Sequence, residues 1–157
     1  MTKVERRLFE HLIDRDSGRV FSDIDFRRCR FQGCGVSITR SPAKRSIVRN
    51  VALHGCEQRG CSIHAAVFDS VMVDGLKTNG LSQTWAAVFK QVVLRGRIDR
   101  VMFSDAVAPG VEGLAPVDEQ RAFNEANAAF YESVDWALDV AEAEFDECDL
   151  FAEYLGH

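Results

Sequence analysis

The sequence predicts an all-β protein: a short parallel β-helix, or β-solenoid, of four to five coils with about 20–21 residues in each coil. Three observations predict this fold. Apolar residues recur at every fifth position, longer segments align at a step of one such coil, and outward residues one step apart carry opposite charges.

The five-residue period is clearest between residues 51 and 88. One series is wholly apolar and a second series, two residues later, is mostly apolar. The first is Val51, Cys56, Cys61, Ala66, Val71, Leu76, Leu81 and Ala86, and the second is Leu53, Gln58, Ile63, Phe68, Val73, Thr78, Gln83 and Val88. A step of five fits neither a helix nor a flat strand, in which an odd step changes faces. It fits a coil of four short β sides, each pointing two residues inward and followed by a bend.

A longer period stacks these coils. The segments "IVRNVALHGC" (47–56), "VFDSVMVDGL" (67–76) and "VFKQVVLRGR" (88–97) align, with a glycine at one shared position and a valine at another. Residues one coil apart would lie at the spacing of paired strands, about 4.8 Å. We therefore expect Val51, Val71 and Val92 in adjacent rungs.

Outward residues support this period. At the same separation Arg49, Asp69 and Lys90 form one column of alternating charge, and His54, Asp74 and Arg95 form another. Opposite charges directly across paired strands are favourable by roughly 0.2–1 kcal/mol. An incorrect period would have no reason to produce such columns.

The repeats resemble those of the pentapeptide-repeat proteins, whose motif is A-(D/N)-(L/F)-x-x with the small and the large residue inward. The segments that carry the resemblance are "AVFDS" (66–70), "AVFKQ" (87–91), "AEFDECDLFA" (143–152) and "DFRRCRF" (25–31). The resemblance covers about 85–110 residues. It implies a right-handed, four-sided β-helix.

We interpret residues 1–157 as a single domain with four parts. Residues 1–18 are expected to form an N-terminal helical cap, because Val4, Leu8, Phe9, Leu12 and Ile13 mark a helical face after a capping-box pattern at Thr2. Residues 19–106 are the β-helix coils, interrupted at 39–46. Residues 107–133 are a loop (109–116) plus a helix, with Asp118 as its expected cap, and residues 134–157 are a final acidic coil.

Charge is divided along the chain. Residues 1–106 contain 18 basic and 11 acidic residues, whereas residues 107–157 contain 13 acidic residues and one basic residue. Such asymmetry favours attraction between the two parts, within one chain or between two copies in a homodimer. The N-terminal segment mixes both charge signs and no apolar run approaches the length of a membrane span, so we expect a cytoplasmic protein without a membrane segment.

No motif indicates a cofactor or a metal. Cys29/Cys34 and Cys56/Cys61 have a spacing unusual for zinc and occupy inward slots, so we interpret them as reduced core residues. His54 and His64 are ten residues apart and should project from opposite sides of a coil. We expect no catalytic, cofactor-binding or metal-binding residues.

Two groups of residues are candidates for binding a partner. The basic group lies at the first coil and its interruption and includes Arg27, Arg28, Arg30, Arg45 and Arg49. The second group, at the end of the expected helix, comprises Tyr131, Glu132, Asp135 and Trp136. The aromatic residues near the basic group belong to the core, which disfavours nucleic acid as a partner and favours a solvated surface or the docking of an acidic protein segment.

Three functions follow as hypotheses. The first is a non-enzymatic binding or scaffold protein that presents its β-helix to a protein partner. The second comes from the resemblance: some pentapeptide-repeat proteins resemble DNA in shape and charge and bind topoisomerases, although residues 20–106 here are basic. The third is a small enzyme that uses a groove beside the helical excursion. The first hypothesis is preferred, because no catalytic constellation stands out.

Overall fold

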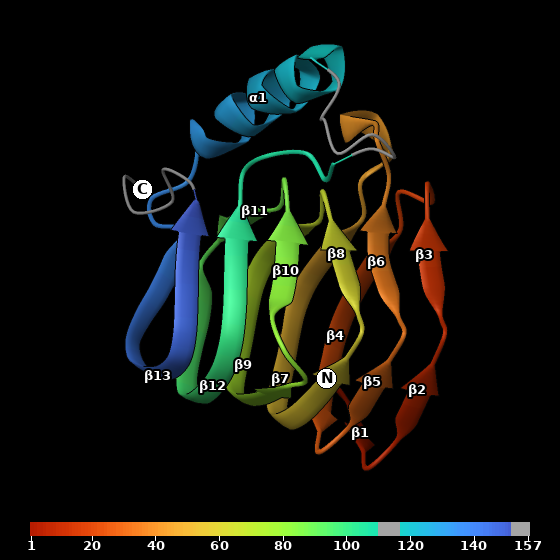
Figure 1. The fold of residues 1–157 in the computed structure, drawn as a ribbon, viewed down its shortest axis with the longest axis vertical. Coiled ribbons are helices and arrows are strands. Elements are labelled where there is room, and N and C mark those ends of the chain that lie inside the picture. Colours follow the sequence, from red (N-terminus) through yellow and green to blue (C-terminus); the bar gives the residue numbers. More distant parts are fainter. Residues whose placement is uncertain (110–116, 152–157) are drawn as a thin grey trace.

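The computed structural model describes residues 1–109 and 117–151, a predominantly parallel β structure with one α-helix (Figure 1). The elements are β1 (Thr2–Glu5), β2 (Leu8–Glu10), β3 (Ile13–Arg15), β4 (Val20–Arg27), β5 (Arg30–Gln32), β6 (Gly35–Ile38), the 3₁₀ helix η1 (Pro42–Lys44), β7 (Ile47–Arg59), β8 (Ser62–His64), β9 (Val67–Thr78), β10 (Ser82–Trp85), β11 (Val88–Lys90), β12 (Val92–Ser104), α1 (Val117–Tyr131) and β13 (Leu138–Phe151).

The strands form one curled, solenoid-like parallel sheet. Its main path runs β1-β4-β7-β9-β12-β10-β8-β6-β3, and β2, β5, β11 and β13 pair with strands of this path. Figure 1 shows the consequence: β6, β8 and β10 lie in front of β4, β7 and β9, with the apolar core between the two layers. Strand β12 belongs to both layers, because it pairs with β9 at one end and with β10 at the other.

The strand registers confirm the expected stacking step. Val51 pairs with Val71, and Met72 pairs with Val93, so each residue meets its counterpart 20 or 21 residues later. The three valines predicted to stack, at 51, 71 and 92, are all buried in one core cluster. The step between β4 and β7 is longer, from Ile24 to Val51, because that repeat contains the 39–46 interruption with η1.

The bends that follow each short β side have a common backbone signature. Positive φ angles recur at every fifth position, at Asn50, Gly55, Gly60, Ala65, Ser70, Gly75 and Gly80. In each group of five residues, one residue with left-handed backbone angles makes the chain bend at a corner. Because the chain bends after each short β side, the two inward residues of every side can face the same core.

The next corner comes one position late, at Ala86, and shifts the frame by one. The inward slot expected at Gln83 is therefore wrong: Gln83 is exposed and Thr84 is buried.

The N-terminal helix predicted for residues 1–18 is wrong. The segment forms β1, β2 and β3, with positive φ angles at Arg6, His11 and Asp16. Leu8, Leu12 and Ile13, assigned to a buried helical face, are about half exposed. Val4 and Phe9 instead face inward at the five-residue step. The Phe9 ring stacks on the Phe31 ring, with the two ring centroids 5.3 Å apart. Over so short a segment, steps of four and five residues select nearly the same positions, so the helical period could not be told apart from the solenoid period.

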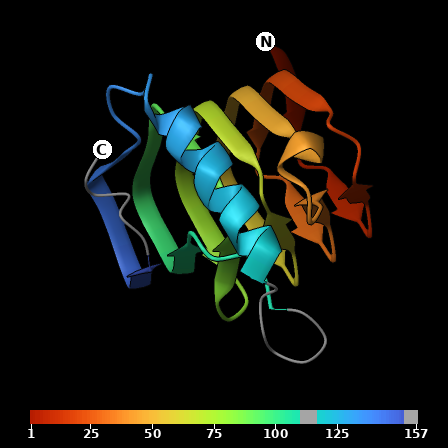
Figure 2. The same cartoon turned by 90° about the horizontal axis from the view of Figure 1, so that it is seen from above.

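The second helix is confirmed as α1, which lies along the stack (Figure 2). Phe123 is fully buried in a cluster with Ala65, Ala86 and Val107, where two alanine corners from successive repeats leave room for its ring. Asp118 lies in the first turn of α1 and is not the cap that the sequence predicted. The predicted loop at 109–116 falls, apart from its first residue, outside the described residues.

The acidic segment predicted as a last coil forms β13, which pairs in parallel with β12. Arg97 forms an ion pair with Asp146, and the Nε atom of Arg100 lies 2.7 Å from a carboxylate oxygen of Glu147. The described acidic strand therefore packs on basic residues of its own chain, and Leu155, expected to continue it, lies outside the described residues. No helix in the described ranges is long and apolar enough to cross a membrane.

Candidate functional site

One corner of the stack is formed by glycine in three successive repeats. Gly55, Gly75 and Gly96 have φ angles of +60°, +75° and +72°. A Cβ atom on Gly96 would lie 2.8 Å from an oxygen of Asp74, so a side chain there would clash as well as strain the backbone. In the two preceding repeats the same position holds Arg6 and Arg28, also at positive φ. We call this column, from Arg6 to Gly96, the glycine corner.

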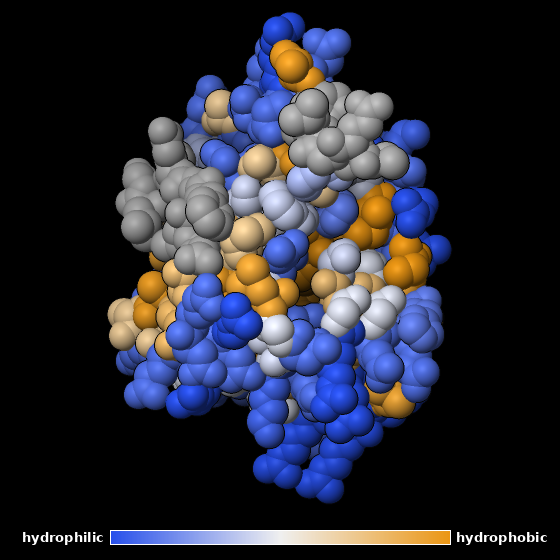
Figure 3. All heavy atoms as spheres, in the orientation of Figure 1, coloured by the Kyte–Doolittle hydropathy of each residue, from blue (hydrophilic) through white to orange (hydrophobic). Residues whose placement is uncertain are grey.

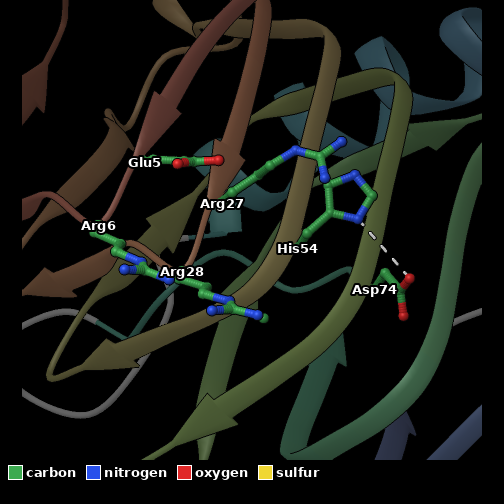
Figure 4. A pocket seen from close by; sticks show the side chains of 7 residues that line it. Glu5, Arg6, Arg27, Arg28, His54 and Asp74 are labelled. Carbon is green, nitrogen blue, oxygen red and sulfur yellow. Dashed lines mark ion pairs between the residues drawn. The ribbon is translucent and has the colours of Figure 1, made fainter.

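A hollow of about 480 Å³, here called the basic hollow, lies on the glycine corner. Arg6, Arg28 and Gly55 line it from the corner, and the neighbouring column of Glu5, Arg27, His54 and Asp74 forms one wall. Figure 4 shows the Arg6 and Arg28 side chains extending the same way below the row that Glu5, Arg27 and His54 form. The lower end of the molecule, where β7, β9 and β12 turn in Figure 1, is mostly hydrophilic in Figure 3.

The wall of the basic hollow is a charge column that extends across the stack. In strand register it runs Glu5, Arg27, His54, Asp74, Arg95, Glu142. This confirms the predicted column of His54, Asp74 and Arg95 and extends it in both directions.

The groups of this column that line the hollow are partnered within the protein. The Nε atom of Arg95 lies 3.2 Å from Asp74 Oδ2, and Nε of Arg27 lies 3.0 Å from Asp25 Oδ2. His54 lies between two carboxylates, with Nε2 3.6 Å from Asp25 and Nδ1 3.8 Å from Asp74. A hydrogen bond from Lys3, at 2.9 Å, lowers the pKa of Glu5.

Arg6 and Arg28 differ from the wall, because neither forms an ion pair within the described part of the chain. They occupy neighbouring rungs at the same position, so two like charges face each other across paired strands. Such a pairing is unfavourable unless a counter-charge lies between the two groups. The side chains are exposed, which leaves them available to an anionic group from outside.

A second hollow, of about 360 Å³, continues along the same corner and shares Gly55 with the first. Gly75, Lys77, Arg97 and Asp99 line it together with the edges of Cys56 and Leu76. The Asp99 carboxylate accepts a hydrogen bond from the Thr78 amide at 3.0 Å, and Arg97 pairs with Asp146. Lys77 is exposed and has no ion pair among the described residues.

Of the basic residues predicted as a binding group, the structure brings only Arg27 and Arg28 into the hollow. Arg30 pairs with Glu57 and Arg49 with Asp69, each at 3.3 Å, on other columns. Arg45 donates to the Asn127 side chain of α1 at 2.7 Å, and burial lowers its pKa. The side chains of Arg30, Arg49 and Arg45 therefore have partners inside the chain.

The second predicted group lies where α1 joins β13. The Tyr131 hydroxyl accepts a hydrogen bond from the Phe89 amide at 3.0 Å, and burial raises the pKa of Tyr131 to about 12. Glu132, Asp135 and Trp136 are exposed, and the Trp136 carbonyl accepts from the Gln91 amide at 3.1 Å. None of the four residues lines either hollow.

Arg6 and Lys77 line the hollows but are not among the binding residues that the sequence predicts. Arg6 fell in the segment assigned to a helix, so its register with Arg28 was not considered. The signal is present in the sequence, since Arg6 and Phe9 have the same spacing as Arg28 and Phe31, with which they align in register 22 residues later. The coil step of the sequence predicts that Lys77 stacks on Glu57, and the two residues do pair in register, but Glu57 forms its ion pairs with Arg30 and Arg59.

The cysteines stack in two pairs, Cys29 with Cys56 and Cys34 with Cys61, as inward residues at corresponding positions. The thiols of Cys29 and Cys34 each lie 3.4 Å from a carbonyl oxygen of the preceding repeat, and Cys61 lies at the same distance from the Phe31 carbonyl. Burial raises the pKa of Cys56 and Cys61, which disfavours the reactive thiolate.

His54 and His64 lie in different surroundings. His64, in β8, is half-buried, and burial together with the nearby Arg40 and Arg15 lowers its pKa. His54 lies in the wall of the basic hollow, on the opposite layer of the curled sheet.

The fold and the hollow define a solenoid-like, mostly parallel β protein with a polar surface groove at one corner. The chain matches no protein-family model, and no curated protein matches it.

Proposed function

We propose that this chain is a non-enzymatic binding protein, a right-handed parallel β-helix of the pentapeptide-repeat kind that holds an acidic segment of a protein partner in the basic hollow. The resemblance of the repeats supports the right hand, and the regular registers between successive repeats support the β-helix. The observation that carries the binding function is the pair of arginines, Arg6 and Arg28, which stack on neighbouring rungs and form no ion pair within the described part of the chain.

The charge division of the chain supports an external acidic partner. The chain's own acidic strand, β13, packs on β12 through Arg97 and Arg100 and leaves the basic hollow open. Rigid stacking also supports a scaffold role, because Arg27, His54 and Asp74 lie on strands that are paired on both sides, so their backbone loses little freedom on binding.

The alternatives have less support. A DNA-like surface needs a continuous run of negative charge, whereas the described column from Glu5 to Glu142 contains both signs. An enzyme with a groove beside the helical excursion needs a concave site at Tyr131 and Asp135, and neither hollow is lined by them.

The test measures binding of fluorescein-labelled hexaglutamate by fluorescence anisotropy at low and high salt. Arg6→Gln with Arg28→Gln is expected to weaken binding about tenfold, as two charge contacts are lost. The matched control, Arg30→Gln with Arg49→Gln, removes the same charge from paired residues and should change binding less than about threefold. Equal losses in the two double variants would mean that only net charge attracts the peptide, and no binding by the unmodified protein would overturn the proposal outright.

Self-association is part of the same proposal, because the basic repeats of one copy and the acidic segment of another attract each other. Light scattering after size exclusion at low salt should detect a dimer that dissociates at high salt. A monomer at every salt and protein concentration would remove this part and leave the binding of other acidic partners unaffected.

A further inference from the structure

The two hollows on the glycine corner contain an imbalance of unpaired charge. Two of the carboxylates that line them form ion pairs within the protein, Glu5 with Lys3 and Asp74 with Arg95, and Asp99 accepts a hydrogen bond from the Thr78 amide. Three of the cations, Arg6, Arg28 and Lys77, form no ion pair in the described chain. The groove therefore offers three cations without an ion pair, at two separate places, against one carboxylate, Asp99, that also forms none among the described residues.

The floor between these places is glycine. Gly55 lies in both hollows, and a Cβ atom there would meet only Arg28 Cγ, at 3.8 Å. A Cβ atom on Gly75 would have no neighbour closer than 3.9 Å. The absence of side chains lets a main chain approach the stack closely along the corner.

The distance between the two groups of unpaired cations fits an extended peptide. From Arg28 to the repeat that carries Lys77 is two strand spacings, about 10 Å, which an extended peptide covers in about three residues. The unpaired cations lie in two separate places rather than in a continuous row, which disfavours the evenly charged backbone of a nucleic acid. Aromatic residues that could stack on bases are absent from the described lining of both hollows.

We propose that an extended acidic peptide lies along the glycine corner, with one carboxylate between Arg6 and Arg28 and a second, three or four residues away, beside Lys77. This inference rests on the proposed function and specifies its ligand. The peptide's main chain would lie over Gly55 and Gly75, and its carboxylates would relieve the repulsion between the two stacked arginines.

The experiment uses the same hexaglutamate probe with two matched pairs of variants. Gly55→Asn places a side chain on the groove floor, and asparagine tolerates positive φ. Gly60→Asn is its control, because Gly60 has the same φ of +60° on a different corner and a Cβ atom there meets nothing within 4 Å. Lys77→Gln is compared with Lys90→Gln, which removes the same charge from the Asp69 column.

Gly55→Asn and Lys77→Gln are each expected to weaken hexaglutamate binding about two- to fivefold, with both controls within about twofold of the unmodified protein. If the arginine double variant weakens binding while Gly55→Asn and Lys77→Gln behave like their controls, this inference is wrong and the proposed function stands. If the arginine variant has no effect, the proposed function itself fails. Lys77→Gln changes only an exposed side chain. If Gly55→Asn does not fold, the effect of Lys77→Gln on hexaglutamate binding tests the inference by itself.

A competition arm distinguishes the ligand class. Displacement of labelled hexaglutamate by unlabelled hexaglutamate, and not by inorganic phosphate or a 12-nucleotide single strand at equal charge concentration, is the expected result. Stronger displacement by either phosphate compound would overturn the assignment to a peptide.

Discussion

The Oδ2 atom of Asp69 lies 3.3 Å from Nε of Arg49, its partner in the preceding repeat. Lys90 lies on the other side of Asp69 in the same column, as the sequence period predicted. Arg49 and Asp69 are in contact because parallel pairing stacks residues of successive repeats. Measuring this contact therefore tests the solenoid-like register.

The first prediction concerns this contact. A double-mutant cycle with Arg49→Ala and Asp69→Ala should give a coupling of about 0.2–1 kcal/mol in urea unfolding, decreasing as salt is added. Arg121 and Asp118, 3.8 Å apart and highly exposed on α1, provide the control pair and should show weaker coupling. A coupling of zero for Arg49 and Asp69 would contradict the structural pairing.

The second prediction concerns the docking of α1. Phe123→Ala should lower the free energy of unfolding by about 3–5 kcal/mol, because the fully buried ring leaves a cavity against Ala65 and Ala86. Val117→Ala, at a residue that is 72% exposed in the same helix, should change stability by less than about 0.5 kcal/mol. Similar small losses for both variants in urea titrations would show that α1 is not packed on the stack.

The third prediction concerns Tyr131. Titration of tyrosine absorbance at alkaline pH should show one tyrosine with a pKa of about 12. This titration step should be absent in Tyr131→Phe. Because the folded-state pKa is raised above the unfolded value of about 10, stability should be retained below pH 10 and fall as the pH rises toward 12. Tyr131→Phe should also cost about 1 kcal/mol at neutral pH, since the Phe89 amide loses this acceptor. A tyrosine titration complete near pH 10 would contradict the buried position.

The fourth prediction concerns His64. Burial and the charges of Arg40 and Arg15 lower its pKa, so the unfolded chain takes up the proton first as the pH falls. Stability should therefore decrease as the pH falls below about 6.5, with a slope of at most about 1.4 kcal/mol per pH unit from this residue. His64→Gln should flatten the profile between pH 5 and 7. An unchanged slope in that variant would assign the dependence to other groups.

Much of the architecture was predictable from particular residues. The valines at 51, 71 and 92 and the charges at 49, 69 and 90 specify a parallel register, because only stacking at the coil step buries the first set and pairs the second. The helix ending at Tyr131 followed from its apolar stripe and the loop signal before it. The N-terminal repeat was missed because Val4 and Phe9 fit two periods equally well over so short a segment.

The sequence by itself determined that the chain stacks in parallel and at what step, since apolar and charge periodicity are properties of spacing along the chain. Only the tertiary structure decided which charges stay unpaired, because a counter-charge is supplied by another repeat at a distance that spacing alone does not reveal. Arg28 and Arg30 look equivalent as sequence; in the fold Arg30 meets Glu57, whereas Arg28 meets Arg6 and an open glycine floor.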